Sequence, residues 1–402
     1  MAFKRVVVGL SGGVDSSVAA YLLLQQGYEV IGIFMRNWHD ESVVINQECP
    51  WIDDSNDAML VANQLGIPFQ VLDLSKAYKE RIVEYMFQEY EAGFTPNPDI
   101  LCNREIKFDV FLKAAEQLGA DYVATGHYCQ KTESQLNGMT SFHLLAGADA
   151  NKDQSYFLCQ TNQAQLAKAL FPIGHLQKSE VRRIAMEIGL PTAQKKDSQG
   201  LCFVGKVKLP VFLQQQLAPK AGNIIEISVD EFNAHGADLV LSSAEHLETN
   251  WDKLSRRVDW SAMKGKWVGK HQGAHYYTVG QRKGLKLGGF KEPIFILAVD
   301  TETNTVYVGE GEHHPGLFRS VIFIPHGEQA WLQPKEAFFN QSEECDFLVR
   351  IRYRQPLEKA SMIMDKDGIY LVFSDPQRAV ARGQFAAWYR DNELIGSGRI
   401  VR

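Results

Sequence analysis

Cysteine is scarce in this chain, and no two cysteines stand at CxxC spacing. Six cysteines are spread over 402 residues, which argues against a disulfide scaffold, a zinc knuckle and an iron–sulfur site. Long hydrophobic runs are also absent, because none approaches the roughly 20 residues that span a bilayer. The first apolar stretch starts directly after Lys4, so we expect no leader segment. These absences predict a cytoplasmic protein with reduced thiols and no membrane partner.

Two common nucleotide-binding loops are absent as well. The sequence has no GxxxxGK[ST] loop with its phosphate-binding lysine and no GxGxxG loop. In their place, SGGVDSS at 11–17 lies between the apolar run 6–10 and the helical pattern 18–24. Glycines let a backbone approach an anion closely, and a helix N-terminus directs N–H groups at it. The segment predicts a phosphate-binding turn and resembles the pyrophosphate loop of the ATP pyrophosphatases.

Strand and helix patterns alternate over residues 1–126, which predicts an α/β domain with a parallel sheet. Strands are expected at Arg5–Leu10, Glu29–Met35, Phe69–Asp73 and Tyr122–Thr125. Helices are expected at Ser16–Gln26, Asp54–Leu65, Ala77–Glu91 and Ile106–Leu118, with two more near Asn162–Ala169 and Ser179–Ile188. Ligands bind at the carboxyl ends of parallel strands, where 11–16, 35–38 and 126–128 fall.

The C-terminal part has a different pattern. From Ile294 onward, short alternating segments are separated by turn signals such as Asp367-Gly368 and Asp391-Asn392, which predicts a β-barrel or sandwich. A chain of this length is expected to form two or three domains. We expect a catalytic domain at 1–206, a small mixed central domain at 207–292 and a C-terminal β-barrel at 293–402.

Charge is segregated although the net charge is only −6. Residues 264–291 carry seven lysines and arginines and no acid, whereas residues 224–252 carry seven acids and no lysine or arginine. Local patches rather than the total charge decide whether a protein binds a polyanion. The basic run is therefore a candidate nucleic-acid surface, although either run could also be ordinary solvated surface.

Two polar segments each contain one cysteine. In TPNPDILCN at 95–103, the prolines predict a stiff, non-helical loop that holds Asp99 three residues before Cys102. In KKDSQGLCF at 195–203, Cys202 follows a glycine and two lysines, and cations favour the reactive thiolate. Taken singly, each cysteine fits a buried, inert thiol better than a nucleophile. Taken together, both lie in loops where a structural cysteine has little to pack against.

Six motifs in the same chain resemble the bacterial tRNA-specific 2-thiouridylases, enzymes that replace O2 of the wobble uridine (U34) by sulfur. The motifs are SGGVDSS at 11–17, TPNPDILCN at 95–103, ATGHY at 124–128, NKDQSYFL at 151–158, KKDSQGLCF at 195–203 and YTVGQRKGL at 277–285. The resemblance covers nearly the whole chain. One departure is the stretch near 228–264, which is longer than in the usual form, so its role is uncertain.

The resemblance implies a role for each of several residues. ATP would bind at Gly9, Leu10, Ser11, Gly12, Gly13, Val14, Asp15, Ser16, Met35 and Gly126, with Met35 packed on the adenine. The target base would be held by Asn97, Pro98 and Asp99, with Asp99 also a candidate proton shuttle. Other tRNA contacts would be His127, Lys152, Asp153, Gln154, Arg352, Tyr353 and Gln384. Cys202 would carry a persulfide, and Cys102 would be the partner nucleophile.

The implied reaction needs ATP and Mg²⁺, because a urea-like carbonyl oxygen leaves only after it has been adenylated. Sulfur from the Cys202 persulfide then replaces it, and a Cys102–Cys202 disulfide is left for a thiol reductant or sulfur donor to reset. We find no dedicated cage for a metal, since phosphates and water supply most Mg²⁺ ligands. The partners expected are the anticodon stem-loop of tRNA and a sulfur donor such as a cysteine desulfurase.

Three other functions fit parts of the sequence. An amidating ligase or a lysidine-forming synthetase would use the same loop but would not need paired cysteines. A tRNA-binding module with a degenerate ATP site would release no pyrophosphate, and a sulfur carrier would not modify tRNA. The intact loop at 11–17 argues against the last two.

Overall fold

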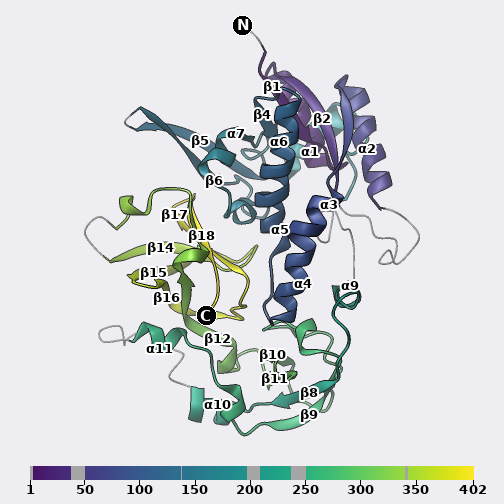
Figure 1. The fold of residues 1–402 in the computed structure, drawn as a ribbon. Coiled ribbons are helices and arrows are strands. Elements are labelled where there is room, and N and C mark those ends of the chain that lie inside the picture. The colour runs from purple at the N-terminus through teal and green to yellow at the C-terminus, as the bar shows by residue number, and fades with distance from the viewer. Residues whose placement is uncertain (1–2, 38–49, 137, 197–208, 237–249, 340–342) are drawn as a thin grey trace.

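The computed structural model describes every residue except 1–2, 38–49, 137, 197–208, 237–249 and 340–342. The described residues contain three sheets, one in each successive part of the chain (Figure 1). Within these residues, no helix is both long enough and apolar enough to cross a membrane.

The N-terminal sheet confirms the predicted parallel arrangement. Its order is β3-β2-β1-β4-β7, and every pairing is parallel. Val6 and Val8 pack with side chains of the first two helices, whereas Val7 faces the opposite cluster. Burial on both faces explains the unbroken apolar run of the first strand. The strands are β1 (Arg5–Gly9), β2 (Glu29–Arg36), β3 (Phe69–Asp73), β4 (Tyr122–Ala124) and β7 (Ala169–Leu170).

The helices of this part follow the predicted alternation with strands. The first two are α1 (Val14–Gln25) and α2 (Pro50–Leu65), and a continuous helical stretch is formed by α3 (Ser75–Tyr78), η1 (Lys79–Val83) and α4 (Glu84–Glu91). A second continuous stretch is formed by α5 (Pro98–Leu101), η2 (Cys102–Val110) and α6 (Phe111–Gln117). Farther along come η3 (Ser155–Leu158), α7 (Gln163–Lys168) and α8 (Lys178–Glu187).

The prediction of a non-helical loop around Cys102 is wrong. Asn97 caps a helix by accepting a hydrogen bond from the N–H of Ile100, and Pro98 occupies the first helical turn. Proline is well suited to that position, because its missing N–H would have no intrahelical partner there. The prolines therefore start a helix rather than forbid one, and Cys102 lies inside it.

A β-hairpin that the sequence reading missed leaves the N-terminal part and joins the C-terminal sheet. It consists of β5 (Cys129–Leu136) and β6 (Met139–Ala146). Leu144 and Leu145 of β6 pair with β18 near the C-terminus. The hairpin therefore ties residues about 250 positions apart into one sheet, and Figure 1 shows it bridging the two parts.

The central sheet has the order β10-β11-β8-β9. A boundary between 292 and 293 would divide this sheet, because β10 pairs with β11 and β11 pairs with β8. The strands are β8 (Gly222–Glu226), β9 (Lys266–His271), β10 (Ile294–Asp300) and β11 (Thr305–Glu310). Short helices around them are α9 (Leu209–Leu213), α10 (Val229–Gly236), α11 (Trp251–Ser255), η5 (Trp260–Ala262) and η6 (Ala274–Tyr276).

The C-terminal part confirms the predicted all-β pattern. Its main path is β12-β16-β15-β14-β17-β18-β6-β5, with β13 paired to β18. The remaining strands are β12 (Phe318–Pro325), β13 (Gln329–Trp331), β14 (Glu344–Arg350), β15 (Glu358–Asp365), β16 (Gly368–Arg378), β17 (Phe385–Arg390) and β18 (Glu393–Arg399). Single 3-10 turns occur at η7 (Pro315–Leu317), η8 (His326–Glu328) and η9 (Lys335–Ala337).

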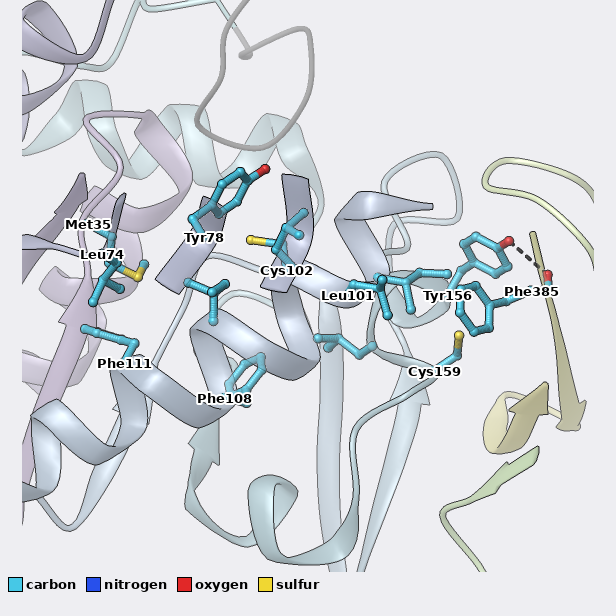
Figure 2. Close-up of a cluster of buried hydrophobic side chains, with 14 of the residues drawn as sticks. Met35, Leu74, Tyr78, Leu101, Cys102, Phe108, Phe111, Tyr156, Cys159 and Phe385 are labelled. Carbon is cyan, nitrogen blue, oxygen red and sulfur yellow. Dashed lines mark hydrogen bonds between the residues drawn. The ribbon is translucent and has the colours of Figure 1, made fainter. Parts of the chain in front are cut away.

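One large apolar cluster connects the N-terminal and C-terminal parts. It contains Met35, Cys102 and Phe111 from the first part together with Phe385 and Tyr389 from β17. Figure 2 shows this cluster, in which the Tyr156 hydroxyl donates a 2.9 Å hydrogen bond to the Phe385 carbonyl. Burial of these side chains fixes the helix that carries Cys102 against the C-terminal sheet.

Candidate active site at the carboxyl edge of the parallel sheet

The loop at 11–17 follows β1 and opens α1, as the sequence predicted. Gly12 has a φ of +72°, and a Cβ placed there would lie 2.1 Å from the carbonyl oxygen of Asp54. Gly126, after β4, is equally confined, since a Cβ there would lie 2.7 Å from the backbone nitrogen of Ser16. Both positions therefore require glycine. The loop and the end of β4 pack directly against each other.

The serine hydroxyls of the loop bond mainly to the loop itself. Ser16 Oγ accepts from the Ser11 N–H at 3.1 Å, and Ser17 Oγ donates to the Gly13 carbonyl at 2.8 Å. Ser16 and Ser17 are both buried. These bonds hold the turn in shape, while Ser11 and Gly13 remain partly exposed at the helix N-terminus. The free N–H groups of a first helical turn attract an anion there.

Asp15 is held by two partners that the sequence reading did not identify. Its carboxylate accepts from the Tyr128 hydroxyl at 2.7 Å and forms an ion pair with Lys178 Nζ at 2.7 Å. Lys178 begins α8, and only about an eighth of its side chain is exposed. Tyr128 is the last residue of the ATGHY motif, so the sequence did mark its position. Lys178 belongs to none of the motifs, and nothing in the sequence indicates that it lies beside the loop.

A metal site built by the protein is not evident from these contacts. The carboxylate of Asp15, the acid of the loop, is already neutralised by Lys178. In the parts of the chain that the structure describes, no group of three or more histidine, cysteine or acidic side chains is placed to hold a metal. Phosphates and water would therefore supply the ligands of any Mg²⁺ that accompanies a nucleotide.

Met35, expected on the adenine, has its side chain in the core. It is 3% exposed and belongs to the cluster of Leu74, Tyr78 and Phe111 (Figure 2). Its Cε lies 3.0 Å from the position that a Cβ of Gly9 would occupy. Gly9 is thus small because the Met35 thioether fills the space beside it.

The segment 95–97 is held in place by the C-terminal part of the chain. Gln384 Nε2 donates to the carbonyls of Thr95 at 2.9 Å and Pro96 at 3.1 Å, and its Oε1 accepts from Asn97 Nδ2 at 3.1 Å. The Thr95 N–H also donates to the Arg382 carbonyl at 2.7 Å. The side-chain amide of Gln384, which was expected to contact tRNA, is therefore hydrogen-bonded to the segment that precedes Asp99.

Cys102 is completely buried. The expectation that it has little to pack against is wrong, because η2 lies inside the large apolar cluster, where Figure 2 shows Cys102 beside Tyr78. Asp99 lies one turn earlier in the same helix and is half-buried. Cys202 lies outside the described residues, so the structure does not place the two cysteines relative to each other.

Lys195, expected to favour a thiolate at Cys202, is paired elsewhere. Its ammonium bonds to Asp54 at 2.7 Å and also to Asp57. Burial lowers the pKa of Lys195, but the hydrogen bonds that its ammonium donates to Asp54 and Asp57, together with the charges of these carboxylates, outweigh this effect and raise the pKa overall. The positive charge of Lys195 is therefore largely compensated by the carboxylates of Asp54 and Asp57 on α2.

His127 is a buried residue rather than an exposed contact. Its Nδ1 lies 2.7 Å from Thr125 Oγ1, its Nε2 lies 3.4 Å from Lys107 Nζ, and 7% of the residue is exposed. Burial, and secondly the charge of Lys107, lowers the pKa of His127 well below its ordinary value. The imidazole is therefore neutral at pH 7.

The three residues expected to contact tRNA at 152–154 differ in their surroundings. Asp153 is buried, accepts from the N–H groups of Gly147 and Ser155, and forms an ion pair with Arg350 at 3.0 Å. Gln154 Oε1 accepts from the Tyr128 N–H at 3.0 Å. Lys152 is half-buried. Asp153 therefore lies in the interior, whereas Gln154 is half-buried and its side-chain oxygen is bonded to the backbone.

Arg352 and Tyr353 follow β14 instead of lying on it. Arg352 is exposed and donates to the Arg378 carbonyl at 3.2 Å. The centre of the Tyr353 ring lies 4.4 Å from that of Phe157. The guanidinium of Arg354 lies over the Tyr353 ring, 5.2 Å from its centre. Both side chains remain available at the surface near the helix of Cys102.

Three family models match this chain in succession. They are described as a tRNA methyl transferase HUP domain at residues 4–206, a tRNA methyl transferase PRC-barrel domain at 254–310 and an aminomethyltransferase beta-barrel domain at 325–400. The fold and the glycine turn therefore define a multidomain protein of the tRNA-modifying class that carries an α/β domain of this type.

Full-length relatives define the family more narrowly. The chain is 60% identical to the tRNA-specific 2-thiouridylase MnmA of Flavobacterium johnsoniae over 399 residues, which cover 99% of this chain and 100% of the relative. It is 58% identical to that of Christiangramia forsetii over 99% of this chain and 100% of the relative. Identity to that of Chlamydia trachomatis serovar D is 41%, over 99% of this chain and 97% of the relative. The chain belongs to the MnmA family of tRNA-specific 2-thiouridylases.

Proposed function

We propose that this chain catalyses the ATP-dependent 2-thiolation of the wobble uridine of tRNA. The observation that carries the proposal is the match to tRNA-specific 2-thiouridylases along 99% of the chain. The geometry agrees with it, because the glycine turn stands at the carboxyl edge of the parallel sheet, where such sheets bind ligands.

ATP supplies the adenylyl group that makes O2 of the uracil a leaving group. The backbone N–H groups at the start of α1 and the confined glycines Gly12 and Gly126 fit a triphosphate. Gly9, Leu10, Ser11, Gly13, Val14, Asp15 and Ser16 complete the turn. Lys178 compensates Asp15, so that a free carboxylate does not repel the phosphates. We assign no protein ligand to Mg²⁺, which would arrive with the nucleotide.

Cys202 is proposed as the persulfide carrier and Cys102 as the second nucleophile. The Cys102 thiolate attacks the Sγ of Cys202, so that the Cys202 S–S bond breaks and a Cys102–Cys202 disulfide forms. The terminal sulfur leaves as hydrosulfide, adds to C2, and expels AMP. Alternatively the terminal sulfur adds to C2 before Cys102 attacks. In both cases two electrons from a thiol reductant return Cys102 and Cys202 to thiols, and a fresh persulfide donor then transfers its terminal sulfur to Cys202.

The substrate base is proposed to reach Asn97, Pro98 and Asp99 after it has been extruded from the anticodon loop. RNA-modifying enzymes take their target base out of the stack in this way. Asp99 is half-buried one turn before Cys102, a position that suits a proton shuttle. Lys152, Arg352 and Tyr353 are the side chains available for the surrounding tRNA, and the sulfur donor is a separate protein of the cell.

The experiment that tests the proposal measures thionucleosides in tRNA. Unmodified tRNA is incubated with the protein, ATP, Mg²⁺ and sulfide, then digested and analysed by mass spectrometry. We expect 2-thiouridine, and none when ATP is replaced by an analogue that cannot be cleaved between the α- and β-phosphates. Pyrophosphate release that depends on tRNA but yields no thionucleoside would contradict sulfur transfer while retaining adenylation.

A further inference from the structure

A cavity of about 500 Å³ lies away from the glycine turn, between the central and C-terminal sheets. Its walls come from residues 92–95 after α4, from 255–261 between α11 and η5, from β10, from β12 and from 379–382 before β17. Five arginines line it, against three acidic residues. The cavity is therefore positively charged on balance, whereas the chain as a whole is negative.

Three of these arginines, Arg257, Arg319 and Arg382, form no ion pair with any residue that the structure describes. Arg319 Nη1 donates only to the Phe318 carbonyl at 2.7 Å. Arg382 Nε donates to the Val401 carbonyl at 2.9 Å, and its guanidinium lies 4.1 Å from the centre of the Phe94 ring. Arg319 and Arg382 are half-buried, whereas Arg257 is exposed beside them. A cation withdrawn from water without a counter-charge is costly, so the retention of Arg319 and Arg382 needs a reason.

The pKa values reflect the same lack of compensation. Burial lowers the pKa of Arg319 to about 10. Burial also lowers the pKa of Arg382 to about 10, and the charge of Arg257 contributes in the same direction. An arginine in water has a far higher pKa. Each group would recover its ordinary pKa if an anion entered the cavity.

Four of the other charged groups of the cavity, Arg256, Arg402, Asp259 and Asp300, already have partners. Arg256 and Arg402 both pair with Asp252, at 2.5 and 3.0 Å. Asp259 accepts from Ser261, and Asp300 accepts from the N–H groups of Glu302 and Thr303. Arg256 and Arg402, which have a structural role, are thus neutralised by the carboxylate of Asp252. Among the described residues the chain supplies no ion-pair partner for Arg257, Arg319 or Arg382, and only the charge of Glu89, outside the cavity lining, raises the pKa of Arg382.

We propose that this cavity binds a phosphate group of the tRNA backbone through Arg257, Arg319 and Arg382. A guanidinium matches the geometry of a phosphate and can donate two parallel hydrogen bonds to it. Thr95 lines the cavity, and its N–H donates a hydrogen bond to the carbonyl of Arg382. Asn97 follows Thr95 by two residues in the chain. A phosphate held here therefore belongs to the same nucleic acid that presents its base at Asn97. The proposal rests on tRNA being the substrate.

The first test measures the salt dependence of tRNA binding. We expect Arg257→Gln and Arg319→Gln to weaken binding about 5- to 20-fold at low salt and to reduce the slope of log K against log salt by about 1 each. Arg256→Gln is the matched control, because it removes the same charge from an adjacent, ion-paired arginine. An equal loss in Arg256→Gln would indicate a general field effect and overturn the proposal.

The second test separates a tRNA phosphate from a free anion. Inorganic phosphate is added without tRNA, and the unfolding temperature of wild type and variants is recorded. Stabilisation lost in Arg257→Gln, together with the changed tRNA slope, supports the proposal. Stabilisation with an unchanged slope would assign the cavity to a free anion and overturn the tRNA assignment. Arg257 is exposed, so its variant remains folded if Arg319→Gln does not. Both readouts are independent of thiolation, so the proposed function could fail separately.

Discussion

At the scale of single residues, the clearest prediction concerns the two cysteines. We expect Cys102→Ser and Cys202→Ser each to abolish formation of 2-thiouridine, because an alkoxide cannot carry or release sulfur, while ATP and tRNA still bind. Cys345→Ser is the control, since Cys345 lies half-buried on β14, far along the chain from both segments. Mass spectrometry of digested tRNA measures the product. Near wild-type thiolation in either variant would refute the two-cysteine scheme.

Gln384 is predicted to position the target-base segment instead of binding tRNA. Its amide makes three hydrogen bonds to residues 95–97, and small misplacements of a reacting group can cost about 10²-fold in rate. We expect Gln384→Ala to lower kcat about 10- to 100-fold while the Kd for tRNA changes less than about 2-fold.

The comparison variant for Gln384 is Arg352→Ala. Arg352 is exposed, so its loss should weaken tRNA binding and change kcat little. Filter binding gives the Kd, and single-turnover thiolation at saturating tRNA gives the rate. A loss of affinity in Gln384→Ala equal to that in Arg352→Ala would restore Gln384 as a direct tRNA contact.

His127 predicts a pH dependence of stability. Its folded pKa lies well below 6.5 because of burial and of Lys107, so the unfolded chain binds a proton between that folded pKa and 6.5 while the folded chain does not. The contribution of neutral His127 is therefore complete above pH 6.5 and is lost as the pH falls below it, by at most about 1.4 kcal/mol per pH unit.

The variant His127→Gln removes this titration. Urea unfolding at pH 7.0, 6.0 and 5.5 should show a smaller loss of stability with falling pH in the variant than in the wild type. The matched control is His313→Gln, because His313 is almost fully exposed and its variant should follow the wild type. Parallel curves for wild type and His127→Gln would contradict a neutral buried imidazole.

At the scale of elements, the strand–turn–helix unit at residues 5–25 depends on Gly12. An alanine there would adopt a left-handed φ, at a cost of about 1–2 kcal/mol, and its Cβ would collide with the Asp54 carbonyl. Gly27 is the matched control, with a φ of +85° and nothing within 4 Å of a Cβ. We expect Gly12→Ala to cost at least twice as much as Gly27→Ala in unfolding free energy, and to abolish ATP binding.

Urea unfolding measures the two costs, and equilibrium dialysis measures ATP binding. Equal destabilisation by Gly12→Ala and Gly27→Ala would contradict this prediction. It would mean that α2, which contains Asp54, can shift away from an added Cβ at little cost in free energy.

The sequence was most informative for elements whose pattern is local. Four of the five strands of the parallel sheet and the positions of α7 and α8 follow from periodicity, whereas β7 (Ala169–Leu170) was not predicted. In the structure, α7 starts at a capping box formed by Asn162. Rules based on local sequence failed where the same residue type is compatible with two different structures. Pro98 can end a helix or begin one, and only the hydrogen bond from the Ile100 N–H to Asn97 decides.

The β5–β6 hairpin and the Asp15–Lys178 pair could not be predicted, because both depend on distant parts of the chain. The hairpin is stabilised by pairing with β18, and its strands carry polar residues such as Gln130 and Thr132 that do not alternate clearly with apolar ones. The surroundings of several expected tRNA contacts could not be predicted for the same reason. Burial of His127 and Asp153 follows from tertiary packing that a motif does not reveal.

At the scale of the whole molecule, the two cysteine segments belong to the N-terminal part, whereas the bonds that place residues 95–97 come from the C-terminal part. The apolar cluster and Gln384 join these parts, and Asp153–Arg350 adds a buried ion pair between them. Removal of one partner of such a pair leaves an uncompensated charge. The C-terminal part therefore holds the segment 95–97 in place.

Part of the basic run at 264–291 lies on β9 of the central sheet, and all seven of its lysines and arginines are exposed. Lys266 and Lys270 project from β9, next to Trp267, which is 58% exposed. Each phosphate that a lysine neutralises steepens the salt dependence of binding by about 0.7 to 0.9. If this edge strand follows the tRNA backbone, the double variant Lys266→Gln/Lys270→Gln should flatten the slope of log K against log salt by about 1.5, with a smaller effect on thiolation at saturating tRNA.

The control for this double variant is Lys359→Gln/Lys366→Gln, which removes the same charge from exposed positions in the C-terminal sheet and its turn. Binding is measured by fluorescence anisotropy between low and moderate salt, because screening hides the difference at high salt. A flattened slope in the β9 variant alone places RNA along the central sheet. Identical slopes in both variants would mean that only the net charge matters, and that the segregation of charge along the chain has no role in positioning tRNA.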